Sequence, residues 1–265
     1  MVVAGVLAGG VATAGAATLP TLSISLGPKS IAVSGPTQSG AVNVVATATG
    51  GLKEPSVTLF ALKPGATAAE LLAYIGNKHS DPNGVGKIGT IVFGNEARPG
   101  KGSEAQTVLT PGNYVALYLG EEGEPIAHTE FTVTPSPSPA ALPAPEATET
   151  SIEFGFRGPT TLHNGELVRF ENEGFLVHMI FAVPVRSRAA AKKFTRALIA
   201  GKEHQAFRMV AGQPLAWLTP VSSGAFQQTT ITAKPGIYVE VCFMETQDGR
   251  DHTRLGMERT IRITK

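Results

Sequence analysis

The sequence predicts an all-β protein built from two similar β-sandwiches in tandem. The chain has 265 residues, of which 30 are glycine and 19 are proline, and these residues separate short segments of alternating polar and apolar character. Long amphipathic helical stripes are few. The length favours two ordinary cores, and a segment of unusual composition divides the chain into two halves that resemble each other.

The dividing segment has the sequence PSPSPAALPAPEATE, which is rich in Pro, Ala and Ser. It has too few large apolar side chains to pack a core and is typical of an extended, semi-rigid linker. We therefore predict a first sandwich over residues 18–134, a linker over 135–147 and a second sandwich over 148–265.

Residues 1–17 form an uncharged run of small and apolar residues that ends in Ala14-Gly15-Ala16. This pattern predicts a signal peptide or its remnant, and a protein that is secreted, periplasmic or otherwise exposed at the cell envelope. A membrane anchor is the alternative. The run is short and rich in Gly and Ala, so we expect no membrane span in the mature chain.

The two halves can be aligned on three kinds of segment. Residues 111–118 (PGNYVALY) match 235–242 (PGIYVEVC), and residues 57–62 match 178–183. A helix-like stretch follows the latter pair, at residues 66–74 and 188–200, so each sandwich is predicted to carry one short helical insertion. Ten residues past the end of the first match stands a histidine in each half, His128 and His252. Periodicity alone leaves an immunoglobulin-like pair of sandwiches open.

The second half contains metal-binding residue types that the first half lacks. Cys242 stands where the first half has Tyr118, and His178 stands where it has Val57 or Ser56. Cys242 is the only cysteine, so an exported chain cannot use it for an internal disulfide. It is a buried thiol, half of an intermolecular disulfide or a metal ligand.

Two histidines, a thiolate and a thioether form a donor set that suits copper. His252 and Met257, which have four residues between them, complete such a set with His178 and Cys242. Each of these residues alone is more often core filler than a ligand. Their joint presence in one half favours metal binding, and we read His128, which has no thiolate partner, as a surface or loop residue.

These residues lie in motifs that resemble the cupredoxin family. The motifs are NEGFLVH at 172–178, PGIYVEVC at 235–242 and HTRLGM at 252–257. The resemblance covers residues 148–265 and implies two tandem cupredoxin-like Greek-key β-sandwiches, of which the first is degenerate. It also implies one type 1 (blue) copper ion per chain, held by His178, Cys242 and His252 with Met257 as a weak axial ligand. His252 would lie at the exposed end of the site, with Leu255 and Gly256 forming a docking surface.

The sequence departs from the family pattern at two places. Nine residues, Phe243 to Asp251, separate Cys242 from His252, where small electron carriers of the family have only a few. The turn-forming run QDGR at 247–250 would let this loop fold back on itself. Met179 stands directly after His178, where many family members keep an Asn that ties the two ligand loops together.

A comparably long loop occurs in two-domain copper nitrite reductases, which resemble this chain in that respect. Those enzymes hold a second copper through histidines, one of them directly before the Cys. Here the corresponding positions are Val241 and Val183. We therefore predict that the chain is not a nitrite reductase or oxidase.

Charge gives the last sequence-based expectations. The chain has 22 Lys and Arg against 21 Asp and Glu, which gives no reason to expect a nucleic-acid partner. Residues 186–208 hold seven basic residues and one acidic residue, a pattern of a solvated helix face or, less often, of docking to an acidic redox partner or an anionic envelope polymer. The leading hypothesis is one-electron transfer by copper in the cell envelope. The alternative is a non-redox structural or binding module whose copper site is weak or vestigial; copper storage is weaker, because the chain has only five Met.

Overall fold

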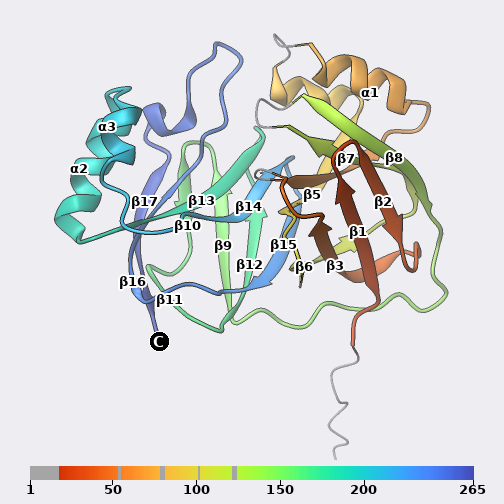
Figure 1. The fold of residues 1–265 in the computed structure, drawn as a ribbon, viewed down its shortest axis with the longest axis horizontal. Helices are drawn as coiled ribbons and strands as arrows, with labels where there is room; N and C mark the ends of the chain where they lie inside the picture. Colours follow the sequence, from red (N-terminus) through yellow and green to blue (C-terminus); the bar gives the residue numbers. More distant parts are fainter. Residues whose placement is uncertain (1–17, 53–54, 78–80, 101, 121–123) are drawn as a thin grey trace, which may run out of the picture.

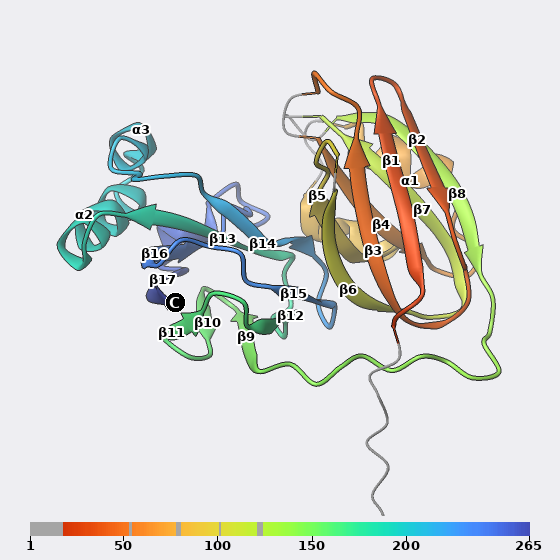
Figure 2. The ribbon, with the colours of Figure 1, turned by 60° about the horizontal axis from the view of Figure 1, so that its bottom comes forward.

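The computed structural model describes residues 18–52, 55–77, 81–100, 102–120 and 124–265. The predicted leader, residues 1–17, lies outside the described residues. Two β-sandwiches stand side by side, with the C-terminus in the second (Figures 1 and 2). None of the helices in the described part of the chain is long and apolar enough to cross a membrane.

The first sandwich contains two four-stranded layers. Its strands alternate as predicted; in β1, for example, Leu22, Ile24 and Leu26 point into the core and are almost fully buried. One layer has the order β6-β3-β1-β2 and the other β5-β4-β7-β8. The strands are β1 (Thr21–Gly27), β2 (Ser30–Ser34), β3 (Gly40–Ala48), β4 (Ser56–Leu62), β5 (Gly89–Glu96), β6 (Ser103–Leu109), β7 (Gly112–Leu119) and β8 (Pro125–Val133).

The second sandwich repeats this arrangement. One layer has the order β10-β9-β12-β15 and the other β11-β17-β16-β13-β14. The strands are β9 (Ala147–Ile152), β10 (Gly155–Arg157), β11 (Thr161–His163), β12 (Leu167–Asn172), β13 (His178–Val185), β14 (Leu215–Val221), β15 (Phe226–Thr230), β16 (Gly236–Val241) and β17 (Glu258–Thr264). Except for the short β11, each strand has a counterpart at the same place in the first sandwich, and the predicted pair of all-β sandwiches is confirmed.

A tyrosine contact occurs at the same place in both sandwiches. The Tyr114 hydroxyl donates to the Thr110 carbonyl at 3.0 Å, and the Tyr238 hydroxyl donates to the Lys234 carbonyl at 2.9 Å. Each ring thereby fastens a strand to the turn that precedes it, as tyrosine corners do in β-sandwiches. The match between residues 111–118 and 235–242 therefore holds in the structure.

The strand register corrects the rest of the sequence alignment. Tyr114 lies opposite Ala61, whereas Tyr238 lies opposite Pro184. His178 therefore corresponds to residue 55, two positions before Val57, and the direct alignment of His178 with Val57 or Ser56 was wrong. A shift of two residues keeps every side chain on the same face of a strand, so the hydrophobic pattern alone did not reveal it.

His128 does not occupy the position of His252. It lies on β8, opposite Leu117 and exposed to solvent, and its counterpart by register is Glu258. In the first sandwich β8 begins six residues after β7 ends, whereas residues 242–257 separate β16 from β17. The loop that contains the predicted ligands is therefore an insertion specific to the second sandwich.

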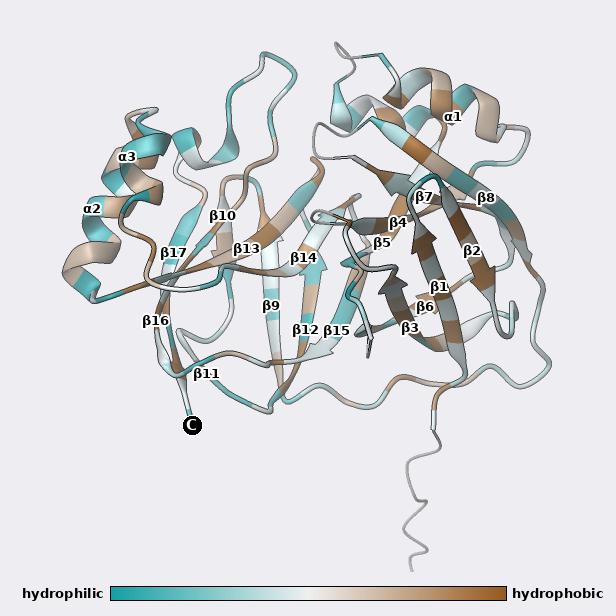
Figure 3. Cartoon of the chain, viewed as in Figure 1, coloured by the Kyte–Doolittle hydropathy of each residue, from teal (hydrophilic) through white to brown (hydrophobic). Residues whose placement is uncertain are grey.

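Helices occupy the same insertion point in both sandwiches. In the first, α1 (Ala68–Ile75) and the 3₁₀ helix η1 (Pro82–Lys87) lie between β4 and β5. In the second, α2 (Arg188–Ile199) and α3 (Glu203–Phe207) lie between β13 and β14. Thr67 begins α1 with a capping box to Glu70, and Ser187 caps α2. In Figure 3 apolar residues follow strands such as β1 and β13, while α2 and α3 alternate between hydrophilic and hydrophobic stretches.

The two sandwiches share one sheet. Strand β15 pairs with β6 through Gln228 and Gln106, which joins the two four-stranded layers into eight strands. The Thr107 hydroxyl donates to the Phe226 carbonyl at 2.9 Å across this joint. A second contact lies nearer the predicted site, where the Ile91 backbone N–H donates to the Ser222 hydroxyl at 3.0 Å. These bonds orient the first sandwich against the ligand loops of the second.

Candidate metal centre

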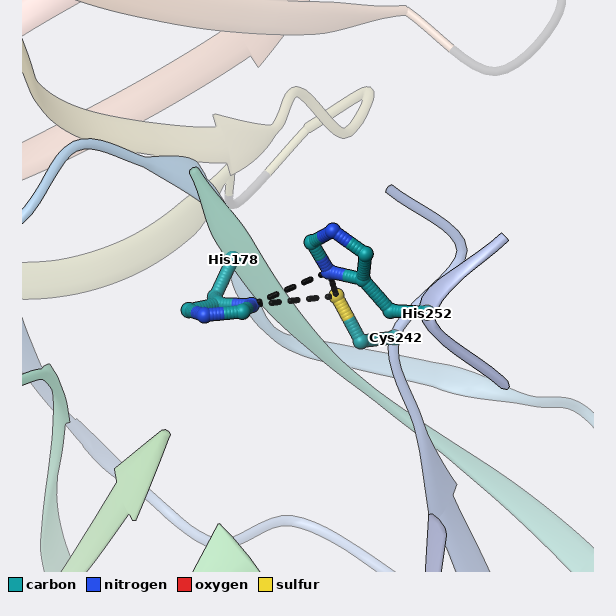
Figure 4. Close-up of side chains that lie close together, drawn as sticks. All are labelled: His178, Cys242 and His252. Atoms are coloured by element: carbon teal, nitrogen blue, oxygen red, sulfur yellow. Dashed lines mark hydrogen bonds between the residues drawn. The ribbon is translucent and has the colours of Figure 1, made fainter. Parts of the chain in front are cut away.

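Three of the four predicted ligands converge in the second sandwich. Suitable donor atoms of His178, Cys242 and His252 lie within 4.8 Å of one another, and all three residues are fully buried (Figure 4). His178 is the first residue of β13, Cys242 directly follows β16, and His252 begins the 3₁₀ helix η2 (His252–Leu255). Because β13 and β16 are neighbours in the sheet, their adjacent ends place His178 and Cys242 side by side.

The loop before His178 is held by one buried asparagine. The Asn172 side chain donates to the carbonyls of Leu176 at 2.8 Å and Val221 at 2.9 Å, and it accepts from the Gly174 N–H at 2.9 Å. These three bonds close the turn between β12 and β13. Asn172, the first residue of the NEGFLVH motif, thus holds the turn that leads to His178.

The long loop before His252 folds back as a small hairpin. A bridge pairs Glu245 with Asp251, and the Thr246 N–H donates to the Arg250 carbonyl at 3.0 Å. Gly249 takes the left-handed conformation that the tight turn requires, with φ of 75°. The His252 N–H then donates to the Met244 carbonyl at 2.8 Å, so the nine-residue excursion returns His252 next to the strand that it left.

The donor atoms form a nearly equilateral triangle. The Nδ1 atoms of His178 and His252 are 3.1 Å apart, and they lie 3.7 and 3.4 Å from Cys242 Sγ. The circle through these three atoms has a radius of about 2.0 Å, close to the typical metal–nitrogen distance of about 2.0 Å and slightly below the metal–thiolate distance of about 2.3 Å known for zinc. One ion at the centre of the triangle would be within bonding reach of all three residues.

Glu153 lies beside His178, whose buried Nε2 atom has no hydrogen-bond partner. One oxygen of its carboxylate accepts from the backbone N–H groups of Phe175 and Leu176 and lies 3.7 Å from His178 Nε2. A carboxylate at Nε2 favours the tautomer that carries its proton there, which leaves Nδ1 free to bind a metal. Burial acts to raise the pKa of Glu153, but the N–H groups of Leu176 and Phe175 and nearby His178 hold it below its ordinary value.

Phe154 covers His252. Its ring meets the His252 imidazole edge-on with centroids 5.3 Å apart. Glu153 and Phe154 together form the two-residue turn between β9 and β10, and Phe154 adopts a φ of 57°, which is uncommon for a residue other than glycine. One turn thus supplies a contact to each histidine. The sequence alone did not reveal these two residues, because only the positive φ and the sheet pairing bring them to the site.

His252 is not at an exposed end of the site. Its accessible surface is 0%, and its Nε2 atom is buried and has no hydrogen-bond partner. The Phe154 ring accounts for part of this cover, and so the expectation that His252 would be solvent-facing was wrong. In the neighbouring loop, Phe175 is 89% exposed, which makes it the most exposed large apolar side chain found among the described residues.

The protonation state of the centre depends on burial. Burial, and then His252, lower the pKa of His178 to about 4, while Glu153 acts in the opposite direction. Burial also lowers the pKa of His252. It raises the pKa of the Cys242 thiol to about 12, despite N–H donors such as Met179 N at 3.4 Å from Sγ. At neutral pH the imidazoles are therefore neutral and ready to bind a metal, and a bound cation would have to displace the thiol proton.

Met257 follows η2 and is fully buried. Gly256 ends η2 in the left-handed conformation with φ of 94°, and the Met257 N–H donates to the His252 carbonyl at 3.0 Å. The chain therefore turns back into the sandwich immediately after His252. The role of Met257 as an axial ligand stays a prediction.

The donor set and its environment fit one copper ion per chain. A thiolate and two imidazoles around a single point, in a buried pocket, are the arrangement found in copper electron-transfer sites. Within the described ranges this is the one group of three or more His, Cys, Asp or Glu side chains placed to hold a metal. The two sandwiches and this His–Cys–His group agree with the cupredoxin resemblance of the sequence.

No family model and no curated protein matches the chain. Among solved structures, auracyanin B matches with 21% identity over 47% of this chain and 93% of its own, at a TM-score of 0.29. Auracyanin A, a blue copper protein from Chloroflexus aurantiacus, matches with 20% identity over 44% and 96%, at 0.27. A copper-containing nitrite reductase from Thermus scotoductus matches with 12% identity over 92% and 68%, also at 0.27. Likeness at these levels carries no argument about activity, which has to come from the site itself.

Proposed function

We propose that the chain holds one copper ion through His178, Cys242 and His252, with Met257 as a fourth and weaker ligand, and transfers one electron at a time. The observation that supports this is the triangle of buried donor atoms, whose centre lies at metal-bonding distance from all three. When bound, copper would supply the change between two oxidation states. A thiolate with two imidazoles accommodates both states, because it combines soft and borderline donors.

The surroundings of the centre favour an electron carrier over an enzyme. The two positions at which a second copper would need histidines are Val241 and Val183, and both are fully buried apolar residues. The centre itself is closed by protein, with Phe154 against His252 and Glu153 beside His178. A catalytic metal needs a position open to substrate, whereas an electron carrier needs only a rigid, dry environment.

We place this activity outside the cytoplasm, in keeping with the predicted leader, and expect a redox partner of acidic character. The seven basic residues between Arg186 and Arg208 are all exposed. They lie on and around α2, which packs beside η2. A partner attracted by these charges would sit next to the turn that carries His252.

Copper loading with spectroscopy tests the proposal. Protein loaded with Cu(II) should show an intense visible absorption from Cys242-to-copper charge transfer, and Cys242→Ser and His252→Gln should abolish it while unfolding as the parent does. His163→Gln, which changes an exposed histidine elsewhere in the same sandwich, is the matched control and should keep the colour. A colourless protein that releases its copper on dialysis would contradict the proposal.

Such an outcome would favour the second candidate, a non-redox module. The observation behind this candidate is that the first sandwich has the same strand order as the second without the ligand loop. The fold therefore does not require the metal.

A further inference from the structure

One side chain of the first sandwich reaches the metal-binding half of the molecule. Asn83 lies in η1, and its Oδ1 accepts from the Val177 backbone N–H at 2.8 Å. Its Nδ2 donates to the Glu245 carbonyl at 3.1 Å. Both partners belong to the second sandwich, so the Asn83 amide bridges two segments that are far apart in the sequence.

These two segments are the two ligand loops. Val177 immediately precedes His178, and Glu245 lies in the hairpin between Cys242 and His252, where it pairs with Asp251. A movement of either loop relative to the other would break a bond to Asn83. The amide therefore ties together the backbone that carries the two histidines.

Asn83 is also held in position by residues of its own sandwich. Asp81 Oδ1 accepts from the Asn83 backbone N–H at 2.9 Å and from its Nδ2 at 2.8 Å. The Tyr74 hydroxyl in turn donates to the Asp81 carbonyl at 2.6 Å. All bonds of the amide agree on its orientation, with oxygen toward the N–H of Val177 and nitrogen toward carbonyl and carboxylate oxygens.

The second sandwich has no equivalent side chain at the residue after its first histidine. That residue is Met179, whose thioether cannot donate a hydrogen bond. We propose that Asn83 is a positioning residue of the metal centre, and that the first sandwich serves to lock the His178 and His252 loops at their bonding separation. This inference rests on the proposed copper binding.

The test compares two variants of the full chain that each remove an inter-sandwich hydrogen bond. Asn83→Ala deletes the tie to both ligand loops. Thr107→Val deletes the bond to the Phe226 carbonyl at the joint between β6 and β15, which ties neither ligand loop to the other, and preserves side-chain shape. The readouts are the rate of copper release to a chelator, the Cu(II) electron paramagnetic resonance spectrum and the Cu(II)/Cu(I) potential.

For Asn83→Ala we expect about tenfold faster copper release, as the loss of two ordinary hydrogen bonds implies, together with a changed copper spectrum and a shifted potential. Thr107→Val should leave the spectrum and the potential unchanged. Parent-like behaviour of Asn83→Ala, or equal changes in both variants, would overturn the inference while leaving copper binding intact.

A second measurement does not need the metal. In copper-free protein, amide hydrogen exchange at Val177 should be faster in Asn83→Ala than in the parent and in Thr107→Val, because the amide loses its acceptor. Unchanged protection of Val177 would overturn the inference even if the parent bound no copper. Failure of this inference can therefore be distinguished from failure of the proposed copper binding.

Discussion

Gly174 lies directly against two residues of the metal centre, Glu153 and His178. A Cβ atom there would lie 2.6 Å from Glu153 Oε1 and 2.7 Å from His178 Nε2, both well inside contact distance. The φ of Gly174 is not in the left-handed region, so the backbone itself would accept another residue. Space, and not conformation, requires glycine at this position.

Gly174→Ala is therefore expected to weaken copper binding by about tenfold to a hundredfold, because the methyl group displaces His178 and Glu153 from their positions. Competition with a chelator of known affinity measures this. Gly212→Ala is the matched control, since a Cβ there meets Pro184 at an ordinary 3.5 Å. Equal copper affinity in the two variants would show that the loop adapts to the methyl group.

The sequence alone revealed the metal-donor residues but not the residues that hold them in place. His178, Cys242 and His252 could be predicted because their types and motifs carry chemical information. Glu153, Phe154 and Asn83 are ordinary residues in turns, and only the pairing of β9 with β10 and the docking of η1 bring them to the site. Such tertiary placement leaves no local pattern in the sequence.

Among the elements, α2 combines a buried apolar face with an exposed basic one. Phe194, Ala197 and Leu198 are buried, whereas Lys192 and Lys193 are exposed. The helix contacts η2, and the space beside Gly201, just after the helix, is filled by the guanidinium of Arg254. Basic charge on α2 is therefore contiguous with the turn that begins at His252.

Charge reversal by Lys192→Glu with Lys193→Glu should slow oxidation of the Cu(I) protein by an anionic complex such as hexacyanoferrate(III). Stopped-flow rates are expected to fall several-fold at low ionic strength and to converge with the parent at high salt, because screening removes the attraction. Lys234→Glu with Lys265→Glu makes the same charge change at the opposite end of β16 and β17 and should have a smaller effect. Equal slowing in both variants would show a response to net charge alone.

The helices lie close to the ranges that the sequence predicted, whereas the predicted correspondence of loop residues between the two sandwiches was wrong. Helices expected at 66–74 and 188–200 occur at Ala68–Ile75 and Arg188–Ile199, because their apolar faces are periodic. His128 was paired with His252 by distance along the chain. Distance along the chain does not show whether the intervening residues continue a strand or leave it as an insertion.

For the whole molecule, one buried charge cluster fastens the two layers of the second sandwich. Arg259 on β17 donates to Glu240 on β16 at 2.9 Å and to Glu149 on β9, and both carboxylates are fully buried. One guanidinium cannot neutralise two carboxylates. Burial, and then the charge of Glu240, raise the pKa of Glu149 to about 9, so the cluster holds a proton on this group at neutral pH.

This proton makes stability fall as the pH rises. The folded chain keeps it up to about pH 9, whereas an unfolded chain releases it above an ordinary glutamate pKa of about 4.5. The free energy of unfolding of the copper-free protein should therefore decrease from pH 7 to pH 9, and the Glu149 proton alone contributes at most about 1.4 kcal/mol per pH unit to this decrease. Denaturant titrations at the two pH values measure the slope, which Glu149→Gln should flatten. A parent slope of zero or of opposite sign would contradict this account.

The joining of the two sandwiches was not evident from the sequence. Pairing of β15 with β6 depends on the facing edges of two separate sheets, and no hydrophobic period encodes such a contact. The linker is hydrogen-bonded to both sandwiches. The Ala41 N–H of the first donates to the Ala140 carbonyl at 2.9 Å, and the Gln228 side chain of the second donates to the Pro143 carbonyl at 3.1 Å. The sequence composition indicated its extended form but not its path.

The burial of Cys242 also bears on how such a chain survives an oxidising compartment. An accessible lone thiol there would form mixed disulfides with small thiols or cross-link two copies of the protein. With an accessible surface of 0% and a pKa of about 12, the folded thiol offers neither access nor thiolate to an oxidant. In the proposed location outside the cytoplasm, the thiol would be open to oxidation only until the second sandwich folds, and folding would then protect the sulfhydryl on which the metal centre depends.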